Sequence, residues 1–210
     1  MTARTPSVAA PPNFTVGERA VRPLTVDEVV AMAEHGVLGE DDRVELLHGM
    51  LVRRGPKTPH HETAKTRFMR WLGRGVAEGR FDLLMASALA VPDPTSLPEP
   101  DVAVIARVER PAAFATTALL VVEIADGTLR TDLEVKPPLY AAAGVPEVWV
   151  VEVGRRRLHV LDEPAADGGG YGRVRVIEDQ SEPLRPRHVD APPITLGGLF
   201  AGLEPLVVRS

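Results

Sequence analysis

Apolar and polar residues follow one another along this chain in patterns that predict both α-helices and β-strands. Thr25, followed by Glu28 three residues later, has the pattern of a capping box and predicts a helix over residues 26–35. Apolar positions at helical spacing predict a longer helix over 60–76. Between 44 and 52, apolar residues on both sides of a two-residue turn that ends in glycine predict a β-hairpin.

The middle of the chain contains short apolar segments bounded by Pro and Gly, which is typical of buried β-strands. We expect strands at 81–91, 102–105, 119–124 and 172–178, and a hairpin formed by 148–153 and 157–161. Pro137 and Pro138 cannot lie inside a regular helix, so the helix that ends at Gly144 is expected to start near Lys136 or to be kinked there. These elements predict an α/β fold with a mixed central β-sheet flanked by helices.

The length of 210 residues and an apolar content of 44% predict one compact domain with a substantial core. Residues 1–23 are rich in Pro and polar residues and are expected to form a flexible N-terminal arm, followed by a single domain over 24–210. The first residues contain no long apolar run, which argues against a signal peptide or a membrane span and favours a cytoplasmic, bacterial protein.

Composition excludes several kinds of chemistry. The chain has no cysteine, so it has no disulfide, no thiolate nucleophile and no cysteine-bound zinc. A formal charge of −5 argues against a broad basic surface that coats duplex DNA. Only Lys57, Lys65 and Lys136 among the 24 basic residues are lysine, so a lysine in this chain is mildly informative.

Two acids stand at apolar strands. Glu123 lies within LLVVEIA, and Asp101 directly precedes VAVI after a Pro-rich turn. An ionised carboxylate inside an apolar strand costs several kcal/mol unless a cation or hydrogen-bond donors compensate it. If the two strands are neighbours, both acids would bind Mg²⁺, which prefers oxygen ligands, with Mn²⁺ as a substitute. Lys136 would hold the attacking water or the scissile phosphate.

Four sequence blocks, VELLHG, PEPDVAVI, VVEIADGTLRTDLEVK and PLYAAAGVPEVWVVE, resemble the Uma-two family of restriction endonucleases in the PD-(D/E)xK nuclease superfamily. The resemblance covers roughly residues 24–161 and is most specific over 119–152. It implies a restriction-endonuclease-like core with four catalytic residues: Glu45, Asp101, Glu123 and Lys136. Of these, Asp101 and Glu123 would bind the metal.

The same resemblance places His61 at a position where the family often has histidine, at the start of the long helix. The sequence departs from the superfamily pattern at Ala125, where a lysine is expected two residues after Glu123. Lys136 must therefore supply the cation from the following segment, or catalysis is impaired.

Each of these residues also has a purely structural interpretation. Asp101 could cap a turn, Glu123 could be a solvent-facing acid at a sheet edge, Glu45 could be an exposed acid of the hairpin, and Lys136 could be a solvated partner of Asp132. His61 is also a candidate for contacting nucleic-acid phosphates, together with three arginines on the same predicted helix: Arg67, Arg70 and Arg74. A row of charged residues along a helix is, however, more often a face exposed to solvent. Tyr140 and Trp149 are interpreted as core residues.

We therefore expect a Mg²⁺-dependent endonuclease that hydrolyses phosphodiester bonds of nucleic acid, with DNA as the expected substrate. By analogy alone, a homodimer is expected, since many such folds cut two strands with two subunits. One alternative is a non-catalytic nucleic-acid-binding or regulatory module on the same fold, which Ala125 and the negative charge favour. Another is a glycoside hydrolase with a carboxylate pair, which would need no metal and would stay active in EDTA.

Overall fold

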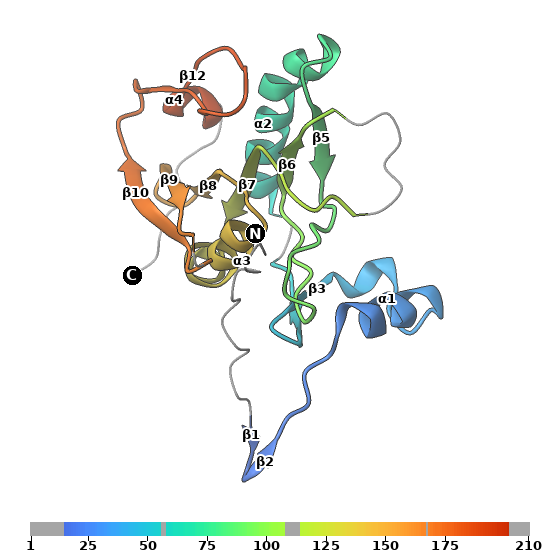
Figure 1. Cartoon of the computed structure of the whole chain (residues 1–210). Coiled ribbons are helices and arrows are strands. Elements are labelled where there is room, and N and C mark those ends of the chain that lie inside the picture. The colour runs from blue at the N-terminus through green and yellow to red at the C-terminus, as the bar shows by residue number, and fades with distance from the viewer. Residues whose placement is uncertain (1–14, 56–57, 108–113, 167, 202–210) are drawn as a thin grey trace, which may run out of the picture.

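The computed structural model describes residues 15–55, 58–107, 114–166 and 168–201. Its centre is a six-stranded sheet in the order β10-β9-β8-β7-β6-β5 (Figure 1). Only the pairing of β7 with β8 is parallel, so the sheet is mixed and the predicted α/β class is confirmed. The six strands are β5 (Asp82–Met85), β6 (Val102–Ile105), β7 (Leu120–Ala125), β8 (Glu147–Glu152), β9 (Arg157–Pro164) and β10 (Tyr171–Ile177).

Helices cover both faces of the sheet, as Figure 1 shows for α2 (Pro59–Ala77) and α3 (Lys136–Ala142). On the α2 face, Phe68 and Leu72 are fully buried in one apolar cluster with Trp149 of β8. On the α3 face, Tyr140 belongs to a second cluster. Because a strand alternates its side chains between these faces, both sides of β7 and β8 are apolar, as their continuous hydrophobic runs predict.

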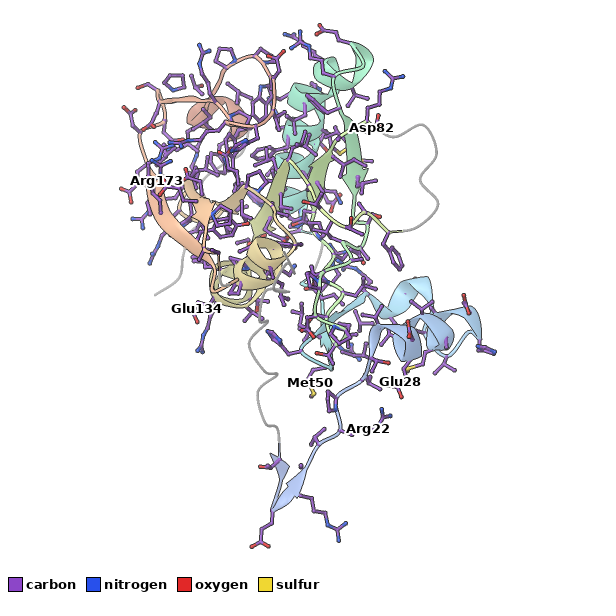
Figure 2. All side chains as sticks on the ribbon, viewed as in Figure 1. Arg22, Glu28, Met50, Asp82, Glu134 and Arg173 are labelled. Carbon is purple, nitrogen blue, oxygen red and sulfur yellow. The ribbon has the colours of Figure 1, made fainter. Side chains whose placement is uncertain are left out.

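A separate hairpin lies beside the main sheet. It consists of β3 (Val44–Leu47) and β4 (Met50–Arg53), with Met50 exposed at its turn (Figure 2). Gly49 in the turn has φ +79°, and a Cβ atom there would lie 2.1 Å from the Pro23 Cβ. An isolated bridge between Leu46 and Leu97 ties the hairpin to the loop that leads to β6. The hairpin predicted from the sequence is therefore present and closely packed.

The first helix, α1 (Val26–Glu34), begins with the predicted capping box. Thr25 Oγ1 accepts a hydrogen bond from the Glu28 backbone N–H at 3.3 Å, and the Glu28 carboxylate accepts one from the Thr25 N–H at 2.9 Å. The arm before it contains two very short strands, β1 (Thr15–Val16) and β2 (Arg19–Ala20), which Figure 1 shows extending away from the sheet. The predicted flexibility of residues 1–14 lies outside the described residues.

One predicted strand is shorter than expected. The pattern over 81–91 predicts a single strand, but β5 ends at Met85 because Ala86 has the left-handed conformation, φ +43°. The helix near Lys136 starts where expected, with Pro137 in its first turn, and a π-helical turn, η2 (Thr131–Val135), precedes it. The remaining short elements are η1 (Glu40–Asp42), β11 (Pro183–Leu184), β12 (Ile194–Thr195) and α4 (Leu196–Leu199). None of the helices in the described ranges is both long and apolar enough to cross a membrane.

Candidate active site

Asp101 and Glu123 lie across from each other on neighbouring strands. The antiparallel register pairs Val102 with Val122, and one step further along this register Asp101 is opposite Glu123. Residues opposite each other in an antiparallel pair project from the same face of a sheet. Both residues are buried, with 6% and 1% of their surface exposed, and both line one pocket. The two acids therefore converge as the sequence predicts.

Three groups hold the Asp101 carboxylate. Its Oδ2 accepts a hydrogen bond from the Ile124 backbone N–H at 2.9 Å and lies 3.2 Å from His61 Nε2, while Oδ1 lies 3.4 Å from Arg54. Burial alone would raise the pKa of Asp101, but His61, the Ile124 N–H and Arg54 together lower it below its usual value. In turn, Asp101 outweighs the effect of burial on His61 and raises the pKa of that imidazole. Asp101 is thus an ionised carboxylate with a fixed orientation.

Glu123 differs from Asp101 because it is almost completely desolvated. Burial, with further repulsion from Asp132 and Asp101, raises its pKa to about 8 despite the attraction of Lys136. Its Oε1 accepts hydrogen bonds from Tyr140 Oη at 2.5 Å and from Lys136 Nζ at 3.2 Å. The other oxygen, Oε2, has no hydrogen-bond partner among the described residues. One oxygen is therefore anchored, and the other remains free to bind a ligand.

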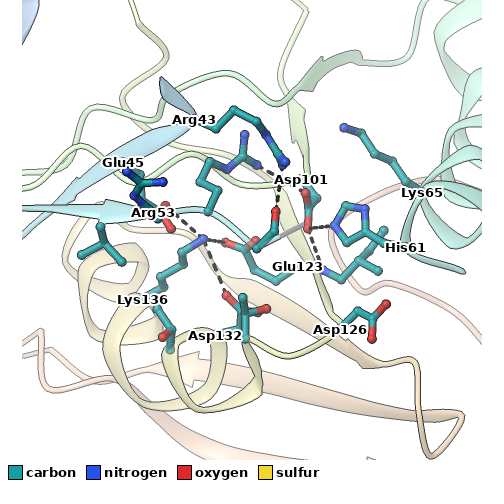
Figure 3. A pocket seen from close by; sticks show the side chains of 16 residues that line it. Arg43, Glu45, Arg53, His61, Lys65, Asp101, Glu123, Asp126, Asp132 and Lys136 are labelled. Atoms are coloured by element: carbon teal, nitrogen blue, oxygen red, sulfur yellow. Dashed lines mark hydrogen bonds and ion pairs between the residues drawn. The ribbon is translucent and has the colours of Figure 1, made fainter. Parts of the chain in front are cut away.

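Three buried carboxylates surround the ammonium group of Lys136. Its Nζ lies 3.1 Å from Glu45, 3.2 Å from Glu123 and 3.6 Å from Asp132 (Figure 3). Burial alone would lower the pKa of Lys136, but the three acids raise it well above its usual value. The alternative in which Lys136 is a solvated surface residue therefore does not apply, since only 4% of its surface is exposed. Glu45 is likewise buried.

The π-helical turn η2 positions Asp132. Thr128 Oγ1 donates a hydrogen bond of 2.5 Å to the Asp132 carboxylate, and the Asp132 N–H donates one to the Thr128 carbonyl. Asp132, Lys136 and Tyr140 are spaced by four residues, which places their side chains near one face of the helical segment. That face is the one directed at Glu123. Single-turn π-helices inside or beside α-helices occur frequently at functional sites.

The N-terminus of α2 is fixed to the end of β7. Thr58, the N-cap of α2, donates its hydroxyl hydrogen to the Asp126 carboxylate and accepts a hydrogen bond from the His61 N–H at 3.1 Å. The hairpin is fixed to the opposite side, where Glu45 Oε2 accepts a hydrogen bond from the Glu99 N–H at 3.1 Å. The site is therefore built from β3, β6, β7, η2, α3 and the first turn of α2.

The pocket between these elements has a volume of about 50 Å³. This space can hold several water molecules, an ion with part of its hydration shell or the tip of a phosphate group. Besides the residues above, three basic side chains line the pocket: Arg43, Arg53 and Lys65 (Figure 3). Its wall thus combines buried acids with cations.

The arginine stripe of α2 lies elsewhere. Arg67, Arg70 and Arg74 line a groove together with Pro192 and Pro193, and none of the three lines the pocket of Asp101 and Glu123. Arg67 also donates a hydrogen bond to the Ala201 carbonyl. The structure therefore brings Glu45, His61, Asp101, Glu123 and Lys136 together and separates the stripe from them.

Sequence reasoning missed some residues that contact the candidate site. Tyr140 was interpreted only as a core residue and Asp132 only as an ion-pair partner, yet both face Glu123. The four-residue spacing from Asp132 to Lys136 and Tyr140 was the signal that could have identified them. Arg54, which contacts Asp101, carried no such signal, whereas Lys65 follows His61 at the same four-residue spacing and lines the pocket.

The donor set fits Mg²⁺, which commonly uses one or two carboxylates and completes its shell with waters and substrate phosphate. Asp101 and the free Glu123 Oε2 would supply those carboxylates. Within the described ranges, no group of three or more His, Asp or Glu side chains is arranged as a ready metal cage. Glu45 and Asp132 are not counted as metal ligands, because Lys136 already neutralises both.

Comparisons with known proteins show that the chain is similar to one protein family and to solved structures. A family model, Uma2, with the description "Putative restriction endonuclease", matches residues 26–190. A crystal structure titled as a "putative nuclease belonging to DUF820" from Anabaena variabilis aligns with a TM-score of 0.69 at 14% identity, over 85% of this chain and 98% of that one. At that identity the alignment shows a shared fold. The search of curated proteins gave no match.

Proposed function

Because the chain belongs to the Uma2 family of restriction-endonuclease-like proteins, we propose that it is a Mg²⁺-dependent endonuclease that hydrolyses phosphodiester bonds in DNA. The observation that carries this proposal is the pairing of Asp101 with a Glu123 carboxylate of which one oxygen is anchored and the other is free. Phosphodiester hydrolysis requires neutralisation of the negative charge on the phosphate. The pocket contains carboxylates that would bind a metal ion and basic side chains that would add positive charge.

Asp101 and Glu123 would hold the cation, which supplies Lewis acidity and a water of lowered pKa. His61, Arg54 and the Ile124 N–H orient Asp101, while Tyr140 and Lys136 orient Glu123 through Oε1. Glu45 and Asp132 hold the Lys136 ammonium in place. Neighbouring groups thus fix the carboxylates of Asp101 and Glu123. Such support keeps ligand oxygens at the positions that a metal ion requires.

Plasmid nicking in Mg²⁺ or Mn²⁺, combined with calorimetric metal titration, tests the proposal. Asp101→Ala and Glu123→Ala should abolish both metal binding and cleavage, since both functions use the same ion. Glu134→Ala is the matched control, because Glu134 is an acid of η2 that pairs with Arg130 at the surface, outside the pocket. Equal cleavage by the wild type and Glu123→Ala would show a contaminating nuclease and remove the support for the catalytic assignment.

A non-catalytic nucleic-acid-binding module is the second candidate. Two observations favour it: Ala125 stands where the superfamily pattern has lysine, and the chain carries a formal charge of −5. Metal binding by the wild type with no cleavage of DNA or RNA across salt and pH would select this alternative. Activity in excess EDTA would instead point to the metal-independent carboxylate-pair hydrolase.

A further inference from the structure

Lys65 is a buried lysine on the wall of the pocket that the reaction described above does not use. It lies on α2, one helical turn after His61, so the two side chains share a helix face. Since His61 contacts Asp101, that face is directed at the metal-binding acids. Only 9% of the surface of Lys65 is exposed, and the side chain lines the pocket on the same side as His61 (Figure 3).

The ammonium group of Lys65 is attracted by Glu99, but none of the described acids lies close enough to form an ion pair with it. Among the described residues it makes no ion pair and no hydrogen bond, in contrast to Arg54, which pairs with Glu99 and Asp101. A lysine that is buried over most of its surface is normally paired with an anion. The buried stem and the unpaired head of Lys65 therefore indicate an anion that the chain itself does not supply.

Lys136 is a poor candidate for binding such an anion. An ammonium group has three N–H donors, and around Lys136 three carboxylates stand within 3.6 Å, from Glu45, Glu123 and Asp132. A contact to substrate would leave one of these buried acids without its cation. Sequence reasoning gave Lys136 two roles, compensation of the acids and contact with the substrate. Its surroundings in the structure favour the first role alone.

We propose that Lys65 is the lysine that contacts a backbone phosphate of the nucleic acid, while Lys136 neutralises the buried acids. This inference rests on the proposed function and deepens it by naming a substrate contact. Arg53 supports the assignment, because it is an exposed residue of β4 that lines the same pocket and makes no ion pair with any described residue. A phosphate in the pocket mouth would lie between these two unpaired cations.

Fluorescence anisotropy with a labelled DNA duplex tests the assignment, with Ca²⁺ in place of Mg²⁺ to measure binding without turnover. Lys65→Met keeps the aliphatic stem and removes the charge. Its affinity should fall by about tenfold, and the slope of log K against log[salt] should become shallower by about one, as for the loss of one phosphate contact. Lys65→Arg should retain most of the affinity, and calorimetric Mn²⁺ binding should be unchanged in both variants.

Arg130→Met is the charge-matched control, because the Arg130 side chain is 89% exposed, pairs with Glu134 alone among the described residues and lies outside the pocket. It should bind the duplex as the wild type does. Wild-type affinity and salt slope in Lys65→Met would overturn the role of Lys65 while leaving the proposed nuclease intact. A lower affinity with an unchanged salt slope would indicate a packing role and would also overturn it. A wild type that neither binds nor cuts nucleic acid would defeat the proposed function itself.

Discussion

Lys136→Met tests the charge balance of the site most directly. Methionine keeps a long unbranched stem in the cavity and removes the ammonium group. Glu45, Glu123 and Asp132 then lose the cation they share. The side chains of all four residues are at most 5% exposed, so solvent cannot replace that cation.

The expected loss of stability follows from this burial. Removing one partner of a buried ion pair costs about 3–5 kcal/mol, and the metal-free variant should lose about that much unfolding free energy at pH 8. The loss should be smaller at pH 5, because burial raises the pKa of both Glu123 and Asp132 and their protonation removes the unpaired charge.

The direction of this pH dependence follows from proton linkage. The pKa of Glu123 is about 8 in the folded protein against an ordinary value of 4.5, so the folded state binds the proton more tightly over that interval. The contribution of Glu123 to stability is therefore complete below about pH 4.5 and is lost as the pH rises through about 8. In Lys136→Met, the unfolding free energy should fall more steeply as the pH rises.

Urea unfolding at pH 5 and pH 8, in EDTA and again with Mn²⁺, measures both effects. Mn²⁺ should recover part of the lost stability in Lys136→Met, because a cation bound by the folded state alone stabilises it. Arg130→Met serves as a surface control. Equal stability of Lys136→Met and the wild type at pH 8 would refute the reasoning, since the three acids would then need no internal cation.

Three further substitutions probe other parts of the structure. Tyr140→Phe removes the hydrogen bond to Glu123 Oε1 and should weaken calorimetric Mn²⁺ binding by about tenfold, the effect of losing one bond to a charged group; unchanged affinity would contradict the anchoring role. Leu72→Ala should lower the urea-measured unfolding free energy by about 2–5 kcal/mol, because its side chain is fully buried against the sheet. Gly49→Ala should lower the melting temperature, since its Cβ would overlap Pro23 at a left-handed backbone position; an unchanged melting temperature would show that this turn tolerates a shift.

Much of the fold could be predicted because its signals are local. The capping box at Thr25 and Glu28 depends on residues three positions apart, and it is present in the structure. The buried strands β6 and β7 are visible as apolar runs for the same reason. The strand expected over 81–91 was too long because the left-handed conformation of Ala86 is not encoded in any apolar pattern.

The candidate site could likewise be predicted only in part. Asp101 and Glu123 stood out because an acid beside an apolar strand is a local anomaly. That one ammonium group contacts Glu45, Glu123 and Asp132 together could not be predicted, because these acids come from β3, β7 and η2, which meet only through the tertiary fold. For Lys65 the informative property is a missing partner, and no sequence pattern displays that.

The π-helical turn makes the site sensitive to chain length. Surface connections usually tolerate gain or loss of a residue, but η2 joins β7 to α3 directly before Lys136. Deleting one residue from 133–135 would rotate Asp132 by about 100° relative to α3. Asp132 would then leave the helix face that carries Lys136 and Tyr140. A chain that keeps this charge arrangement must therefore keep the spacing of the segment as well as its residues.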